Sequence, residues 1–291
     1  MAYSTPPRSP AESPSTPRPR PPRRGRGGEL FGKVFLIALV LALGAGAIYA
    51  VNWLSHPAPP APSGPSGPPP FEVPPLGVAR GSAIPGPATP VPAAQTKVPQ
   101  ENFQGWIKRV SYYTDVPERV LVAYANADLA YQAKNPACHL TWATLAGVGR
   151  VESKHGRYGG ATVLDSGEES KPIIGPALDG SPGFLAVPDT DKGALDGDTK
   201  WDHAVGPMQF APATWHRWGV RASGDGKAPD PQNIDDAAMT AGRYLCAMGG
   251  DLAVPKDWWD GVLAYNNSTA YGQEVFSNAD AYGKVSLGQG L

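Results

Sequence analysis

The sequence predicts a mainly α-helical domain at the C-terminal end of the chain, preceded by a disordered tail, one transmembrane helix and a Pro-rich linker. Three observations carry this prediction: most of the 34 prolines fall before residue 99, one long run is uncharged, and helical spacing of apolar residues begins near residue 98. No alternation of apolar and polar residues is long enough to predict a sheet. We therefore divide the chain into four segments: residues 1–33, 34–54, 55–97 and 98–291.

Residues 1–33 form a tail rich in Pro, Arg and Ser, with few apolar groups. Such a composition cannot offset the entropy lost on ordering, so we expect disorder. The tail carries seven Lys/Arg against two Glu, whereas the whole chain has a formal net charge of −1. Since only this tail is basic, it suggests a membrane flank, and we expect no nucleic-acid partner.

Residues 34–54 are 21 uncharged residues, close to the roughly 20 that a bilayer requires. Because an Arg cluster precedes this run and none follows it, we expect a single-pass cell-membrane protein with a cytoplasmic N-terminus and an extracytoplasmic domain. A cleaved signal peptide is the alternative, since Ala45-Gly46-Ala47 could serve as a cleavage site and release a secreted protein. The apolar run continues past that site, which favours the anchor.

Residues 55–97 are predicted to be a linker, with the segment PAPPAPSGPSGPPP as its most Pro-rich part. Such composition favours an extended polyproline conformation. At about 3.1 Å per residue, the linker could hold the domain up to roughly 130 Å from the membrane.

Seven stretches of the C-terminal segment show apolar residues at helical spacing together with start or stop signals. They cover residues 102–113, 117–132, 141–155, 212–218, 234–248, 258–265 and 273–282. Between Ala161 and Ala204 lies an irregular segment rich in Gly, Pro and Asp, too long for a plain connector.

The stretch from Thr141 to Gly160 contains the acid that we expect to carry the chemistry, Glu152. Leu145 and Val148 precede Glu152 by seven and four residues, so the carboxyl group lies on an apolar stripe near the end of a helix that a glycine cluster terminates. An acid beside apolar groups is harder to ionise, which suits a proton donor. The alternative is a Glu that is ion-paired with a nearby cation: Arg150, Lys154 or Arg157.

Cys138 and Cys246 are the only cysteines. An even pair in an extracytoplasmic domain predicts a disulfide bond between them. No His lies at ligand spacing from either one, so we expect no metal site there, and nothing in the sequence calls for a cofactor.

Four motifs occur in one order between about Phe103 and Tyr282: VESKHGRYGG, AVGPMQFAPATW, SGDGKAPDPQNIDDAAMTAGRYL and AYNNSTAY. Together they resemble the motifs of lytic murein transglycosylases of the membrane-bound B type. This resemblance implies a lysozyme-like helical domain in residues 98–291. It also implies that the enzyme acts on peptidoglycan glycan strands, cleaving the bond between N-acetylmuramic acid and N-acetylglucosamine and leaving 1,6-anhydromuramic acid ends.

The resemblance also assigns roles to individual residues. It implies that Glu152 is the single catalytic acid and base and that Gln209 reaches the sugar at the cleavage site. Tyr265 and Asn266 would line the saccharide groove, and Tyr271 would be a stacking wall nearby. An amide such as Gln209 suits the substrate's acetamide because it both donates and accepts.

Two other functions remain open at this point. One is a hydrolytic muramidase, for which Asp165 is the nearest candidate for the second carboxylate. The other is a non-catalytic peptidoglycan-binding module, against which the presence of Glu152 argues. His155, beside the acid, is expected at the groove edge and outside catalysis.

Four aspartates of the irregular segment suggest a calcium loop: Asp189, Asp191, Asp196 and Asp198. However, Gly193 occupies the position of the fifth-position ligand, and no Glu stands at the twelfth. The separate SGDGKAPD segment is no better as a complete loop. We therefore expect no metal.

Overall fold

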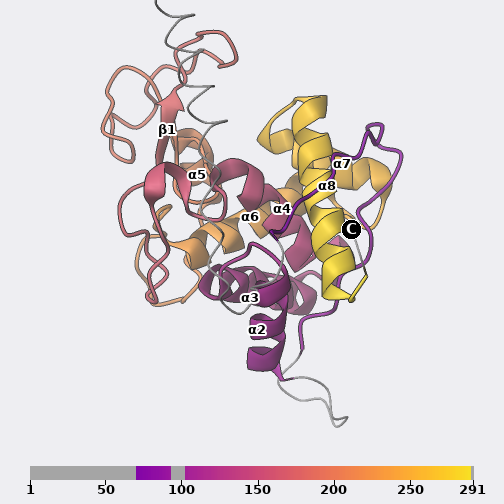
Figure 1. Ribbon diagram of the computed structural model, residues 1–291. Coiled ribbons are helices and arrows are strands. Elements are labelled where there is room, and N and C mark those ends of the chain that lie inside the picture. The colour runs from indigo at the N-terminus through magenta and orange to yellow at the C-terminus, as the bar shows by residue number, and fades with distance from the viewer. Residues whose placement is uncertain (1–69, 93–101, 290–291) are drawn as a thin grey trace, which may run out of the picture. The chain divides into compact units, whose positions relative to one another are not determined.

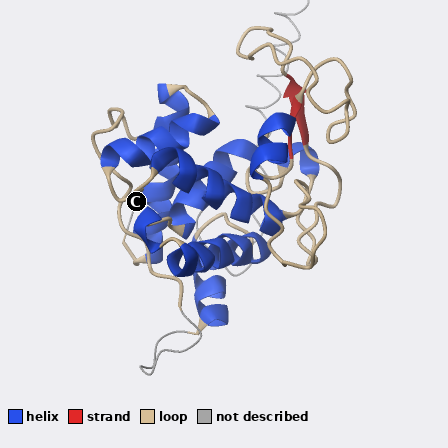
Figure 2. Cartoon of the chain, turned by 180° about the vertical axis from the view of Figure 1, so that it is seen from behind, coloured by secondary structure: helices blue, strands red, loops and turns tan. Residues whose placement is uncertain are grey.

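The computed structural model describes residues 70–92 and 102–289, and this part of the chain is mainly helical, which confirms the predicted class (Figures 1 and 2). The longer helices are α2 (Phe103–Tyr113), α3 (Glu118–Lys134), α4 (Trp142–Ser153), α5 (Pro212–Trp218), α6 (Ile234–Gly249), α7 (Pro255–Tyr265) and α8 (Thr269–Ser286). Two short 3-10 turns accompany them, η1 (Pro136–Cys138) and η2 (Tyr158–Gly160). Each predicted helix is present, although α7 and α8 begin three and four residues earlier than expected.

Side-chain caps explain where several helices begin. Thr141 caps α4 by accepting a hydrogen bond from the Thr144 N–H at 3.2 Å, as its position before the helix predicts. Ser268 caps α8 in the same way, which extends this helix toward its N-terminus beyond Gln273. These oxygen atoms satisfy N–H groups that have no partner within the helix.

The end of α4 differs from the prediction. The glycine cluster is the expected stop, but the helix ends at Ser153, before the first of these glycines. Lys154 and His155 adopt left-handed backbone conformations, with φ of 53° and 61°, and the Lys154 N–H returns to the Arg150 carbonyl. Glu152 therefore lies one residue from the end of α4, beside a sharp turn of the chain.

The core is built around α4, which packs along α8 and against α3, while α6 packs against α3 and α7. Gly147 allows the close approach of α4 and α8, because a Cβ atom there would lie 2.8 Å from the carbonyl oxygen of Val275. The predicted Cys138–Cys246 disulfide is present and joins η1 to α6. It links the segment just before α4 to the distal half of the domain.

A small sheet occurs where none was predicted. Strand β1 (Ile174–Ala177) pairs antiparallel with β2 (His203–Val205), and both appear in red in Figure 2. The strands have four and three residues, too few for the alternation that identifies a strand in a sequence. Most of the irregular 161–204 segment is loop around this pair.

The second half of the predicted linker belongs to the folded domain. Residues 70–92, here called the strap, contain neither helix nor strand but lie against α8 along its length (indigo in Figure 1). The strap N–H groups of Leu76, Gly86 and Thr89 donate to side chains of α8 at 2.9 Å each. Strap residues, which composition predicts to be linker, are thus fixed to the helices by hydrogen bonds.

The predicted tail, the predicted span at 34–54 and the first part of the predicted linker lie outside the described residues. In the ranges 70–92 and 102–289, no helix is both long enough and apolar enough to cross a membrane.

Candidate active site

Glu152 occupies the last turn of α4 and is half-buried. Burial raises the pKa of its carboxyl group to about 7, because a charge loses favourable hydration there. The described residues contain no ion pair to Glu152, and Arg150 is paired with Asp115 at 2.9 Å instead. The structure therefore favours the expectation of a proton donor over that of a surface ion pair.

Two side chains of α8 tune this acid in opposite directions. The hydroxyl of Tyr271 donates a hydrogen bond to Oε1 of Glu152, which lowers the pKa of the carboxyl group. The charge of Glu274, one turn further along α8, raises it. Burial has the largest influence, so the net shift is upward. Tyr271, for which the resemblance implies a stacking wall, is also a direct hydrogen-bond partner of the acid.

The loop that carries Gln209 is attached to the end of α4. Ser153 Oγ donates to the carbonyl of Pro207 at 2.6 Å and accepts from the Gly156 N–H at 2.7 Å. Met208 is fully buried and packs beside Gly149, where a Cβ atom would lie 3.2 Å from its sulfur. Two sequence motifs that are about 50 residues apart therefore form one unit around Glu152.

Gln209 has a positive φ of 47°, and its amide group is turned back into its own loop. Its Nε2 donates to the carbonyls of Gly206 and Ala204, at 2.9 and 3.3 Å. Its Oε1 accepts no hydrogen bond within the part of the chain that the structure describes. This oxygen is therefore the atom of Gln209 that is available to a ligand donor.

Tyr265 lies at the end of α7, and its ring packs on Phe210 and Tyr244 at centroid distances of 5.4 and 5.3 Å. Its hydroxyl is buried and lacks a hydrogen-bond partner among the described residues. Burial raises the pKa of this hydroxyl well above its usual value, and the charge of Glu152 raises it further, so the two groups are neighbours. Asn266, the next residue, is exposed at the C-cap of α7.

His155 is not at a groove edge, which corrects the expectation for this residue. Its side chain is 0% exposed, and its ring lies between the hydroxyls of Tyr282 (2.7 Å) and Tyr124 (3.3 Å). The Tyr282 hydroxyl donates to Asp115, so its oxygen accepts from Nε2 of His155. Burial lowers the pKa of His155, which makes it a neutral member of the core.

Other carboxyl groups near this end of the domain differ in their surroundings. Asp165 is exposed, and the described residues include no hydrogen bond or ion pair between it and Glu152. Glu169, which sequence reasoning missed, is 9% exposed, and both of its carboxyl oxygens lack a hydrogen-bond partner. Burial raises the pKa of Glu169 to about 8.

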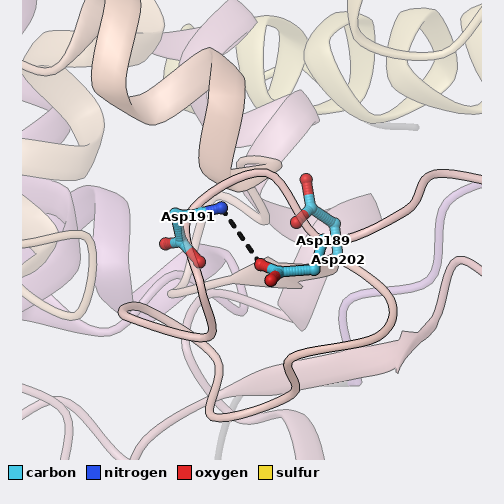
Figure 3. Close-up of side chains that lie close together, drawn as sticks. All are labelled: Asp189, Asp191 and Asp202. Atoms are coloured by element: carbon cyan, nitrogen blue, oxygen red, sulfur yellow. Dashed lines mark hydrogen bonds between the residues drawn. The ribbon is translucent and has the colours of Figure 1, made fainter.

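The aspartates of the irregular segment gather in a set that differs from the predicted calcium loop (Figure 3). Ligand atoms of Asp189, Asp191 and Asp202 lie within 4.8 Å of one another, an arrangement that could hold a metal ion. The set includes Asp202 and does not include Asp196 and Asp198, which the sequence suggested. The Asp202 carboxylate accepts two hydrogen bonds from Thr190, at 2.8 and 2.7 Å. Oxygen ligands of this kind suit Ca²⁺ or Mg²⁺.

Sequence reasoning also missed Glu274 and the contact between Ser153 and Pro207. Glu274 could have been found from its spacing, because it follows Tyr271 by three residues and shares its helix face. The Ser153 contact has no signal in the sequence, since it joins two segments that are distant along the chain.

No protein-family model matches this chain, and no curated protein matches it. Among solved structures, the chain is similar to the Escherichia coli lytic transglycosylase Slt35 in complex with bulgecin A, with 16% identity over 62% of this chain and 79% of the other, and a TM-score of 0.35. The structure of Slt35 in complex with calcium is 17% identical in sequence, with the same coverage of both chains and a TM-score of 0.36. A 36 kDa muramidase/transglycosylase is 17% identical in sequence over 64% of this chain and 82% of the other, with a TM-score of 0.34.

Proposed function

We propose that this chain is a peptidoglycan lytic transglycosylase with a lysozyme-like arrangement of helices, acting in cell-wall remodelling. It would cleave the β-1,4 bond between N-acetylmuramic acid and N-acetylglucosamine and leave 1,6-anhydromuramic acid ends. The observation that supports this most is Glu152. Its pKa of about 7, together with its partner Tyr271, gives a carboxyl group that can both donate and recover a proton near neutral pH.

In the proposed reaction, protonated Glu152 gives its proton to the glycosidic oxygen as the bond to muramic acid C1 breaks. The substrate's own N-acetyl group stabilises the positive charge that develops at C1. The Glu152 carboxylate then takes the proton of the C6 hydroxyl, and O6 bonds to C1. Glu152 ends the cycle protonated, and no water is consumed.

The surrounding groups suit this reaction. Oε1 of Gln209 can accept from the acetamide N–H, and Tyr265 supports the wall of the site beside Glu152, with its hydroxyl buried. Asn266 is exposed at the same helix end and can contact the saccharide. Each is neutral, as expected where the substrate supplies the nucleophile.

Hydrolysis is the second candidate, and one observation favours it. The charge of Glu274 acts on Glu152, so a second carboxylate lies near the acid, as a muramidase requires. Asp165 is less suited to this role because it has no contact with Glu152 in the described part of the chain.

Digestion of purified peptidoglycan in heavy-oxygen water separates these functions. A transglycosylase gives 1,6-anhydromuramic ends without solvent label, whereas a muramidase gives labelled reducing ends. Glu152→Gln is the control for both reactions, since the amide keeps the shape and removes the transferable proton. Reducing ends that carry the label and disappear in Glu274→Gln would establish the muramidase. A wild-type protein that binds peptidoglycan but releases neither product would be a binding module.

We further propose that residues 34–54 anchor the chain in the cell membrane, with the N-terminus in the cytoplasm, because an Arg cluster precedes this uncharged run. A reporter enzyme that works only outside the cytoplasm should be active when fused after Lys97 and inactive when fused at Gly28. Equal activity at both points contradicts this topology. Recovery of the domain in the medium, cleaved near Ala47, would support the signal-peptide alternative.

A further inference from the structure

A cavity of about 780 Å³ lies between the strap and the facing parts of α4 and α8. Val73, Pro75 and Leu76 of the strap form one wall. The volume is within the range of roughly 300–1,000 Å³ that is typical of ligand sites. The cavity exists only because the strap folds back onto the helices.

Hydrogen bonds fix the strap wall in place. Leu76 N–H donates to Ser277 Oγ at 2.9 Å, and Nε2 of Gln273 donates to the Val78 carbonyl at 3.0 Å. The Ser277 hydroxyl also donates to the carbonyl of Gln273 at 2.7 Å. These polar side chains of the lining are therefore engaged in holding the wall.

Some charged side chains of the lining form an ion pair with each other, and others have no partner among the described residues. Arg150 bonds Asp115 through Nε at 2.9 Å and Asn278 through Nη1 at 2.7 Å, so its charge is compensated. Lys154 and Arg157 are exposed, and neither side chain has an ion pair or hydrogen bond with the described residues. Two free cations face the cavity, with Glu274 as the remaining acid.

This cavity adjoins the catalytic acid. Lys154 follows Glu152 by two residues at the end of α4. On α8, Ala270 lines the cavity and precedes Tyr271, the hydrogen-bond partner of Glu152. Glu274 lines the cavity and acts electrostatically on Glu152. A ligand in the cavity would thus be continuous with a sugar held at Glu152.

We propose that this cavity binds the peptide stem of peptidoglycan and that Lys154 and Arg157 are the partners of its carboxylates. Muramic acid carries the peptide on its lactyl group, so the peptide must leave the glycan close to the bond that Glu152 cleaves. A peptide with free carboxylates can reach the two unpaired cations, whereas a glycan freed of its peptides keeps only the lactyl carboxylate, which stays beside its sugar ring. This inference rests on the proposed function, because it assumes a muramic acid at Glu152.

The test compares two substrates with the full chain: intact peptidoglycan, and the same material freed of peptides by an amidase that cuts the lactyl–peptide bond. Wild type should cleave the peptide-bearing strands with a higher kcat/KM. In the double variant Lys154→Gln/Arg157→Gln, the ratio of the two kcat/KM values should fall about five- to tenfold, because charge-assisted contacts to the peptide are lost. Amidation of the peptide carboxylates should lower the wild-type ratio in the same way.

Lys227→Gln is the matched control, since Lys227 is exposed and lies outside the cavity lining, and it should leave the ratio unchanged. Thermal unfolding of each variant checks the fold. Equal wild-type rates on both substrates, or a double variant with an unchanged ratio, would overturn the peptide site. If neither substrate gave anhydromuramic acid ends, the proposed function would be overturned instead.

Discussion

The Tyr271 hydroxyl donates a hydrogen bond to Glu152 across the contact between α8 and α4. It places a donor on an acid that burial makes hard to ionise, so the pKa of Glu152 is set by opposing influences. Burial and the charge of Glu274 raise this pKa to about 7, while Tyr271 lowers it. The proposed acid must be protonated to start the reaction, so activity should be lost as pH rises through about 7.

Removing the hydroxyl of Tyr271 should move this loss to higher pH. In Tyr271→Phe the carboxylate loses the donor that stabilises its charge, so the pKa of Glu152 rises. We expect the basic limb of the kcat/KM profile to shift upward by about one unit. An unchanged or downward-shifted limb would mean that the hydrogen bond does not control the acid.

Removing the charge of Glu274 should have the opposite effect. Glu274→Gln relieves a repulsion that disfavours the Glu152 carboxylate, so the basic limb should move to lower pH by up to about one unit while activity below the limb remains. Tyr271→Phe and Glu274→Gln serve as controls for each other, because their shifts of the basic limb must have opposite signs. Complete loss of activity in Glu274→Gln at every pH would favour the muramidase.

Replacing the acid itself should abolish turnover and leave the fold intact. Glu152→Gln removes the proton donor, for which we expect a loss of about 10²- to 10⁴-fold in kcat. Since the folded state holds this carboxyl at a raised pKa, its ionisation above pH 7 opposes folding, and the variant should be at least as stable as wild type at pH 8. Measurements of wall digestion and thermal unfolding on the same samples check both parts. Near-normal digestion would exclude Glu152 as the acid.

Glu169 predicts a pH-dependent stability. Its pKa is about 8 in the folded protein against an ordinary value of 4.5. Its contribution to folding stability is therefore fully present below about pH 4.5 and is lost as pH rises through about 8. Glu169→Gln should therefore match wild type in thermal unfolding at pH 5 and exceed it at pH 9. Asp165→Asn, at an exposed position nearby, is the control and should behave as wild type at both values. A wild-type advantage at pH 9 would contradict this account.

The strap should contribute to the stability of the domain. Strap oxygens accept from three buried indoles: Ala83 O from Trp259, Thr89 O from Trp142 and Thr89 Oγ1 from Trp106. A chain that begins at residue 98 should lose about 2 kcal/mol or more in unfolding free energy and melt about 4–8 °C lower than one that begins at residue 66. Equal melting temperatures would show that the strap is only a linker.

The sequence by itself determined the helices and led to the prediction that Glu152 is the acid. Apolar spacing and capping residues such as Thr141 are local signals, and local hydrogen bonds decide where a helix begins. The same spacing placed Glu152 on an apolar face and predicted its resistance to ionisation. The cysteine pair was found from its number and expected compartment alone.

The tertiary structure decided everything that depends on segments distant along the chain. In the folded domain His155 lies in the core, and Tyr271 and Glu274 lie beside Glu152. The Pro-rich strap, which composition alone predicts to be a free linker, packs on α8. Composition describes the cost of ordering a segment but not the surface available to receive it. The strap is ordered because α8 and α4 offer hydrogen-bond partners and an apolar surface at matching positions, and this match exists only once the helices have packed.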